Sequence, residues 1–289
     1  MTALEIKDVS YSYSKKTPFE IKALDNINLK IEQGSLTAII GHTGSGKSTL
    51  IRTFNALLTP DSGSVLLMGK DINESKQSKY DAKFQVGLCF QYSEHQLFEE
   101  TVYKDIAFGP KNMKLSEQEV DSCVREAASF VGLTEDMLKK SPFDLSGGEK
   151  RRVAIAGVMS MRPKVLVLDE PVAGLDPKGK NNVLAMIKSY RESTGATVVF
   201  VSHSMEDAAE IADSIVVMNN GHIAFHDSPR AVFSHSEELV QMGLNVPCAT
   251  KIMLDLKAEG YDVDTNTFTI NDAKRSLLDY ISKRGGAVK

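Results

Sequence analysis

Apolar and polar positions alternate along this chain in a pattern that predicts strands and helices in turn. Period-two alternation or short apolar runs predict strands over 4–12, 27–31, 37–40, 65–68, 86–90, 165–169, 197–201 and 214–219. Helical spacing predicts helices over 47–58 and 177–192, and helical character from 101 to 161. Because strands alternate with helices, we expect an α/β fold with a mixed, largely parallel sheet that helices cover on both faces.

Composition excludes several classes of protein. With 42% hydrophobic residues, 25% charged residues and a net charge of −4, the chain has the make-up of a soluble globular protein without a basic field for nucleic acid. No apolar run approaches the ~18 residues needed to cross a bilayer, and the N-terminus lacks a signal-peptide pattern. The cysteines, Cys89, Cys123 and Cys248, are expected to be reduced core residues in a cytosol. Any connection to a membrane should therefore come through a partner chain.

A glycine-rich loop lies between the strand at 37–40 and the helix that begins at Lys47. Its residues are Gly41, His42, Thr43, Gly44, Ser45, Gly46, Lys47 and Ser48. Glycines let successive backbone N–H groups point at phosphate oxygens, and the helix N-terminus adds positive partial charge. In this pattern Lys47 reaches the β- and γ-phosphates and Ser48 offers its hydroxyl to Mg²⁺. The loop predicts a P-loop NTPase that binds ATP and Mg²⁺.

Two acids end the apolar strand at 165–168. Asp169 is expected to project from the carboxyl edge of the sheet and to hold Mg²⁺ through water. Glu170 should point to the other side, where it is the candidate general base for the attacking water. His203 follows the next predicted strand, where a histidine could contact the γ-phosphate and orient the water, although most histidines in proteins have no such role. The other histidines are expected to be surface, turn or packing residues: His42, His95, His222, His226 and His235.

The sequence Leu145-Ser146-Gly147-Gly148-Glu149 lies between the glycine loop and the two acids. Together with the loop, Gln91, the acids and His203, in this order, it resembles the signature of the ATP-binding-cassette (ABC) ATPases over residues 4 to about 235. The resemblance implies that two cassettes face each other head to tail. The signature residues Ser146, Gly147 and Gly148 would then cap the γ-phosphate held by a partner, so hydrolysis should need a dimer.

The resemblance also assigns the rest of the site. Gln91 corresponds to the hinge glutamine that senses Mg²⁺ and the γ-phosphate, and residues 174–177 to a loop that crosses the dimer interface. Tyr13 should stack on adenine, with Tyr11 the alternate on the opposite face of the strand. The implied site is catalytic Lys47, Gln91, Glu170 and His203; nucleotide-binding Tyr13, Gly41, His42, Thr43, Gly44, Ser45, Gly46, Lys47, Ser48, Thr49, Ser146, Gly147 and Gly148; and metal-binding Ser48, Gln91 and Asp169. Two departures, Glu149 for a common glutamine and Val172 for threonine or serine, remove no catalytic group.

The expected domain division follows from these assignments. Residues 1–235 should form the nucleotide-binding domain, with a helical subdomain at about 92–162 inserted in it; Ser116 and Glu119 there form a capping-box pattern. Residues 236–289 should form a helical extension. It would contain a helix near 250–259, an alternating stretch at 261–270 and a second helix capped by Asn271 and running to about 284. We expect this extension to contribute a dimer contact, although its helices could instead only pack on their own domain.

The stretch after Gln91, residues 92–102, narrows the family. It resembles the ATPases of energy-coupling-factor transporters and their cobalt and nickel relatives, as do residues 17–20, 105–110 and 244–247. The resemblance implies the second of two ATPase paralogues, in a heterodimer with its sister at the cytoplasmic face of a bacterial membrane. Its membrane partners would be a transmembrane scaffold (T-type) subunit and a substrate-binding (S-type) subunit for a vitamin or other micronutrient.

The same stretch is the expected docking site for the scaffold, between Gln91 and Asp105. Acids beside apolar residues suit a short helix that carries arginine. The residues concerned are Glu94, Glu99, Glu100 and Asp105 with Leu97, Phe98 and Val102. These carboxylates could instead be a solvated helix face.

Other functions stay open at this point. One is the ATPase of a conventional importer with an extracytoplasmic binding protein, or of a metal-ion importer. A soluble cassette ATPase acting on DNA or ribosomes usually carries a coiled-coil insertion or tandem cassettes, which this chain lacks. A P-loop kinase for a small molecule is disfavoured by the signature sequence.

Overall fold

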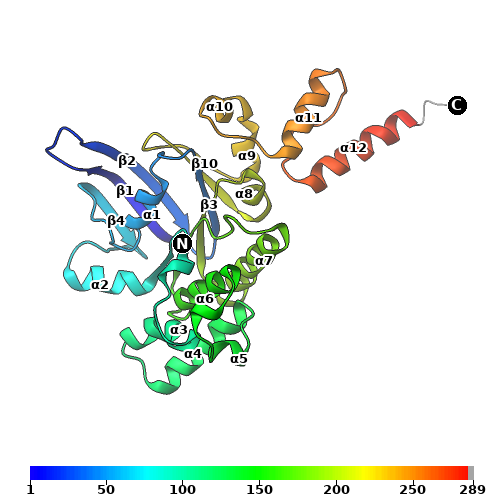
Figure 1. The fold of residues 1–289 in the computed structure, drawn as a ribbon. Coiled ribbons are helices and arrows are strands. Elements are labelled where there is room, and N and C mark those ends of the chain that lie inside the picture. Colours follow the sequence, from blue (N-terminus) through cyan, green and yellow to red (C-terminus); the bar gives the residue numbers. More distant parts are fainter. Residues whose placement is uncertain (286–289) are drawn as a thin grey trace.

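The computed structural model describes residues 1–285, whose strands form two sheets (Figure 1). One sheet is antiparallel with the strand order β2-β1-β4-β5; the other has the order β10-β9-β3-β8-β7-β6, with β9 to β6 parallel and β10 antiparallel at the edge. The strands are β1 Thr2–Tyr13, β2 Ile21–Glu32, β3 Leu36–Gly41, β4 Ser62–Leu67, β5 Lys70–Asp71, β6 Val86–Cys89, β7 Val165–Asp169, β8 Thr197–Val201, β9 Ser214–Asn219 and β10 His222–Asp227. The mixed six-stranded sheet confirms the predicted α/β fold, whereas the separate antiparallel sheet, which packs together with α1 (Lys47–Thr53) on one face of it, was not predicted.

Helices surround the sheets and gather at two ends of the molecule. Figure 1 shows α3 to α6 at one end, and α11 and α12 at the other. The helices are α1 Lys47–Thr53, α2 Lys76–Gln85, α3 Val102–Asn112, α4 Glu117–Phe130, α5 Glu135–Leu138, α6 Gly147–Met159, α7 Pro177–Thr194, α8 Met205–Ile211, α9 Pro229–Ser234, α10 Ser236–Gln241, α11 Cys248–Ala258 and α12 Ile270–Gly285, with 3-10 turns η1 Ser93–Gln96 and η2 Pro142–Asp144. Among the described residues, none of these helices is long and apolar enough to cross a membrane.

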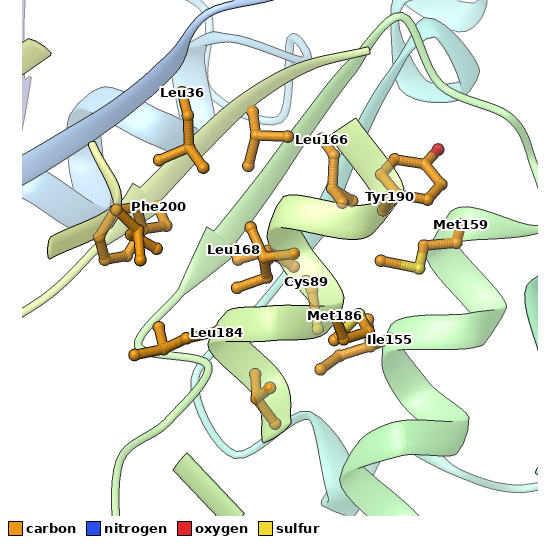
Figure 2. Close-up of a cluster of buried hydrophobic side chains, with 14 of the residues drawn as sticks. Leu36, Cys89, Ile155, Met159, Leu166, Leu168, Leu184, Met186, Tyr190 and Phe200 are labelled. Carbon is orange, nitrogen blue, oxygen red and sulfur yellow. The ribbon is translucent and has the colours of Figure 1, made fainter. Parts of the chain in front are cut away.

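Alternate residues of the central strands are buried on opposite faces of the six-stranded sheet. In β7, Leu166 and Leu168 join one apolar cluster, whereas Val165 and Val167 join another. Figure 2 shows part of the first cluster, where these leucines meet side chains of α6 and α7 such as Ile155. A strand buried on both faces has an almost continuous apolar sequence, which is why these strands could be predicted.

Helix α2 and strand β10 are among the elements that were not predicted, and few of their residues are buried. Helix α2 has Ala82 as its buried residue and is started by Ser75, whose Oγ accepts the Ser78 N–H. Strand β10 is an edge strand whose residues are exposed or half-buried. Neither segment shows the apolar period on which a prediction from sequence depends.

The helix predicted at 47–58 is shorter in the structure. Helix α1 ends at Thr53, and Ala56 adopts a left-handed backbone with φ of 57°. The Leu58 N–H returns to the Arg52 carbonyl at 3.0 Å, which closes the helix end. Pro60 therefore lies beyond a turn rather than directly after the helix.

The C-terminal extension differs from its prediction in three respects. Residues 261–269 form no strand, and Thr269 rather than Asn271 caps α12, since its Oγ1 accepts the Asp272 N–H at 3.2 Å. Cys248 is exposed at the start of α11, whereas Cys89 and Cys123 are buried as expected. Burial raises the pKa of Cys89 to about 11, so this thiol stays protonated near neutral pH.

The extension packs on the rest of the chain through a small apolar contact. Leu239, Leu244 and Phe268 belong to the same buried cluster as the sheet residues. The Phe268 ring stacks on Phe233 of α9, with ring centroids 6.0 Å apart. A division at residue 235 stays a prediction, and residues 286–289 lie outside the described part of the chain.

Candidate functional site

The phosphate loop is held in a shape that only glycine allows at two of its positions. A Cβ on Gly46, which has φ of 105°, would lie 2.6 Å from the Ala23 carbonyl oxygen, and a Cβ on Gly41 would lie 2.4 Å from that of Met218. The Lys47 side chain is 5% exposed and donates to the carbonyls of Gly41 and His42 at 2.7 and 2.9 Å. Burial lowers the pKa of Lys47, against the opposing effect of the nearby carboxylates. The loop is thus curled around its own lysine, at the end of β3.

Asp169 and Ser48 meet beside this loop, as predicted for a metal site. The Ser48 Oγ donates to Asp169 Oδ2 at 3.3 Å, and Asp169 is 6% exposed at the end of β7. Burial raises the pKa of Asp169, and the Ser48 hydrogen bond opposes this effect. Hydroxyl and carboxylate oxygens are the hard donors that Mg²⁺ prefers. Within residues 1–285 no cluster of three or more acids, histidines or cysteines could hold a metal, so phosphate oxygens and water would complete this site.

The Glu170 carboxylate is the point at which three predicted catalytic residues meet. His203 Nε2 lies 2.6 Å from Glu170 Oε1, and the Gln91 side-chain amide donates to Glu170 Oε2 at 3.1 Å. His203, Glu170 and Gln91 follow β8, β7 and β6, respectively. These three strands are neighbours in the sheet, so their carboxyl ends lie side by side and bring the three residues together. Glu170 has φ of 51°, a left-handed conformation that costs a non-glycine residue on the order of 1 kcal/mol. Such strain at a strand end is typical of functional positions.

The signature residues are separate from this cluster. Ser146 caps α6, and no hydrogen bond or ion pair in the described chain joins residues 146–148 to the phosphate loop. The Glu149 carboxylate accepts the Ser146 N–H and hydroxyl at 2.8 and 2.6 Å, which completes a capping box. The Ser-x-x-Glu spacing in the sequence could have revealed this role of Glu149. A cap of this kind fixes the start of the helix at the signature.

The predicted adenine residue, Tyr13, lies against the helix that follows the phosphate loop. Its hydroxyl is 3.2 Å from Thr49 Oγ1. The expectation that Tyr11 points to the opposite face is wrong: the two rings make an edge-to-face contact with centroids 5.0 Å apart. Residues two apart in a strand share a face, so both tyrosines line the same side.

The stretch after Gln91 is only partly available for docking. Glu94 pairs with Arg151, Asp105 accepts the backbone N–H groups of Phe98 and Glu99, and Val102 is fully buried. The acids left at the surface are Glu99 and Glu100, and Glu100 pairs with Lys104. Beside them lies a groove of about 300 Å³, lined among others by the exposed Phe98 and Phe108, whose rings contact edge to face.

Comparison with known proteins gives the class of this chain. The ABC transporter family model matches residues 24–173. A solved structure, cbiO1 from Clostridium perfringens, described as part of the ABC transporter complex cbiONQ, has a TM-score of 0.75 and 36% identity and covers 90% of this chain and 97% of its own. A dimeric post-hydrolysis structure of the ATP-binding cassette MJ0796 with ADP and Pi has a TM-score of 0.70 at 27% identity, with 78% and 98% coverage. The chain therefore belongs to the ABC transporter family and is an ATP-hydrolysing transporter subunit.

A relative that is more similar in sequence than these two structures shows to which branch of the ABC transporter family the chain belongs. The energy-coupling factor transporter ATP-binding protein EcfA2 of Caldanaerobacter subterraneus subsp. tengcongensis is 50% identical over 278 residues, which is 96% of this chain and 97% of the relative. This similarity confirms the predicted branch, the energy-coupling-factor ATPases, over that of conventional importers.

Proposed function

We propose that this chain hydrolyses Mg²⁺-bound ATP within a pair of cassettes and so powers uptake of a vitamin or other micronutrient. The observation that carries the proposal is the convergence of Gln91 and His203 on Glu170 beside the phosphate loop. The chain works in a complex with a paired ATPase and membrane subunits, which places it at the cytoplasmic face of the membrane. Its cargo never needs to touch this chain.

The residues divide the chemistry among them. Lys47 and the loop amides would hold the phosphates, and Ser48 and Asp169 would hold Mg²⁺, which would neutralise phosphate charge. Glu170 accepts the proton of the attacking water while His203 and Gln91 fix the carboxylate. The signature residues, which stand apart from this cluster, complete the site of the paired ATPase. Tyr13 supports the adenine.

The scaffold subunit is proposed to dock at the groove beside Phe98 and Phe108. Two exposed aromatic rings offer apolar anchors, and Glu99 and Glu100 offer negative charge for an arginine-bearing helix. Because Glu94 and Asp105 are engaged inside the protein, charge reversal at Glu99 and Glu100 tests this face without disturbing a buried contact.

The experiment is purification of the complex from its native membrane in mild detergent. With the wild-type chain we expect a sister ATPase, a polytopic scaffold and one or more small membrane subunits; a homodimer with two conventional permeases would contradict the proposal. With Glu99→Lys and Glu100→Lys combined, we expect the amount of scaffold retained to fall about tenfold or more, since like charges at an interface are repulsive. Full retention would exclude docking at this groove. Reversal of Glu192, an exposed acid on α7, is the matched control.

The extension is proposed to contact the paired ATPase through α12. Leu278 and Ile281 on this helix are 55% and 61% exposed, and burial of two such side chains can contribute a few kcal/mol. We expect Leu278→Ser with Ile281→Ser to weaken nucleotide-free dimerisation by about tenfold or more in analytical ultracentrifugation. Ile21→Ser, at an equally exposed site on β2, should have no effect. An unchanged dimer would argue that α12 serves another purpose.

A further inference from the structure

One ion pair of the helical end of the molecule lies inside the protein. Arg151, on α6, donates through Nε and Nη2 to the two carboxylate oxygens of Glu94 at 3.2 and 2.8 Å. The two side chains are 8% and 15% exposed. The remaining guanidinium nitrogen, Nη1, donates to the Ala173 carbonyl. All three nitrogens of the guanidinium therefore have partners within the chain.

These contacts join three segments that serve two different ATP sites. Glu94 lies in η1, three residues after Gln91. Ala173 follows Glu170, and its N–H donates to the Glu170 carbonyl at 3.2 Å. Arg151 lies one helical turn after the signature residues that begin α6. Gln91 and Glu170 act on this chain's own ATP, whereas the signature is offered to the partner.

The ion pair between Arg151 and Glu94 is suited to transmit a movement of η1 to α6. Burial alone would raise the pKa of Glu94, but the hydrogen bonds from Arg151 and from backbone hold this pKa below its usual value. The pair is therefore ionised, and a planar guanidinium engaged on three sides resists rotation in a way that the single point charge of lysine does not. Because η1 packs against α6, a shift of the turn at η1 would thus move the first turns of α6.

We propose that Arg151 is a positioning residue that couples this chain's own ATP site to the signature it presents to the paired ATPase. Through Glu94 it follows the loop that begins at Gln91, and through Ala173 it follows the turn that carries Glu170. The role of this pair is then to make hydrolysis at the two sites cooperative. The inference rests on the proposed function, because it requires a partner cassette.

A second ion pair supplies a matched control. Arg162 donates through Nε and Nη2 to one carboxylate oxygen of Glu126 on α4, so it too pairs with a glutamate through two guanidinium nitrogens. This pair is half-exposed, at 57% and 43%, and joins none of the three segments. If the Arg151–Glu94 pair only stabilised the local structure, its removal should affect ATP hydrolysis no more than removal of the Arg162–Glu126 pair. We expect instead that removal of the Arg151–Glu94 pair alters the kinetics of both ATP sites.

The test is the ATP dependence of hydrolysis by the complete complex carrying Arg151→Lys, Arg151→Gln or Glu94→Gln. We expect kcat to fall about tenfold, because small displacements of catalytic groups are costly, while KM stays within about twofold. The Hill coefficient should fall from above 1 to about 1. Arg162→Gln and Glu126→Gln should leave kcat, KM and the Hill coefficient unchanged. The double variant Glu94→Gln/Arg151→Gln leaves no isolated buried charge, so it should fold and show the same kinetic loss as either single variant.

Several outcomes would overturn the inference. One is an unchanged kcat and Hill coefficient in the folded double variant; another is an equal loss in the Arg162 control. A wild-type complex that hydrolyses ATP without cooperativity would also contradict it. A wild-type complex that does not hydrolyse ATP at all would instead contradict the proposed function, and this result is obtained before any variant is compared.

Discussion

Replacement of Glu170 by glutamine is expected to lower ATP turnover by roughly 10²–10⁴-fold while ATP binding and ATP-driven dimerisation persist. The amide has the size of the carboxylate but cannot accept the proton of the attacking water. The groups that hold the nucleotide, Lys47 and the loop amides, do not depend on Glu170, since Lys47 is fixed by the carbonyls of Gly41 and His42. Binding and chemistry should therefore separate in this variant.

Three measurements on the assembled ATPase pair decide the point. Phosphate release gives turnover, a fluorescent ATP analogue gives affinity, and light scattering after gel filtration gives the fraction of dimer. Glu192→Gln, on the exposed surface of α7, should match the wild type in all three. Near-normal turnover by Glu170→Gln would show that another group, or none, acts as the base.

The central strands, and the position of the candidate hydrolytic residues at their ends, could be predicted because both follow from the same regularity. Strands β3, β7 and β8 are buried on both faces, so they have continuous apolar sequences. Parallel strands end at one edge, so Asp169 and Glu170 are expected to lie near the loop after β3, whereas His203 and Gln91 are assigned from the family resemblance. The structure adds the contact that gives the cluster its geometry, the convergence of Gln91 and His203 on Glu170.

Contacts between segments far apart in the chain could not be predicted in this way. From the sequence alone, Arg151 is one more basic residue of a predicted helical region, and Glu94 is one of several acids in the predicted docking stretch. Their pairing depends on η1 lying beside α6, which no local pattern specifies. Polar elements were missed for a related reason: α2 and β10 lie at the surface, so neither has an apolar period to detect.

Replacement of Gly147 by aspartate is the second change with a large expected effect, and it separates folding from assembly. A Cβ on Gly147 would meet no atom within 4 Å, and an acid in the first turn of a helix is favourable for the helix itself. The isolated chain should therefore fold and bind ATP through its own loop. In the complex, however, the new carboxylate would face the γ-phosphate held by the paired ATPase.

That repulsion is expected to abolish ATP-driven dimerisation and to lower turnover by about 10²-fold or more, as when a group that stabilises developing charge is lost. Gly147→Ala, which adds volume without charge in the same open space, should keep most of the activity. The decisive measurement uses mixed pairs: the Gly147→Asp chain is combined with a sister whose own signature is intact. ATP held by this chain should then still be capped by the sister, whereas the site that needs this chain's signature should fail. Loss of this chain's own ATP binding, with dimerisation preserved, would mean that the signature acts within its own chain and not on a partner.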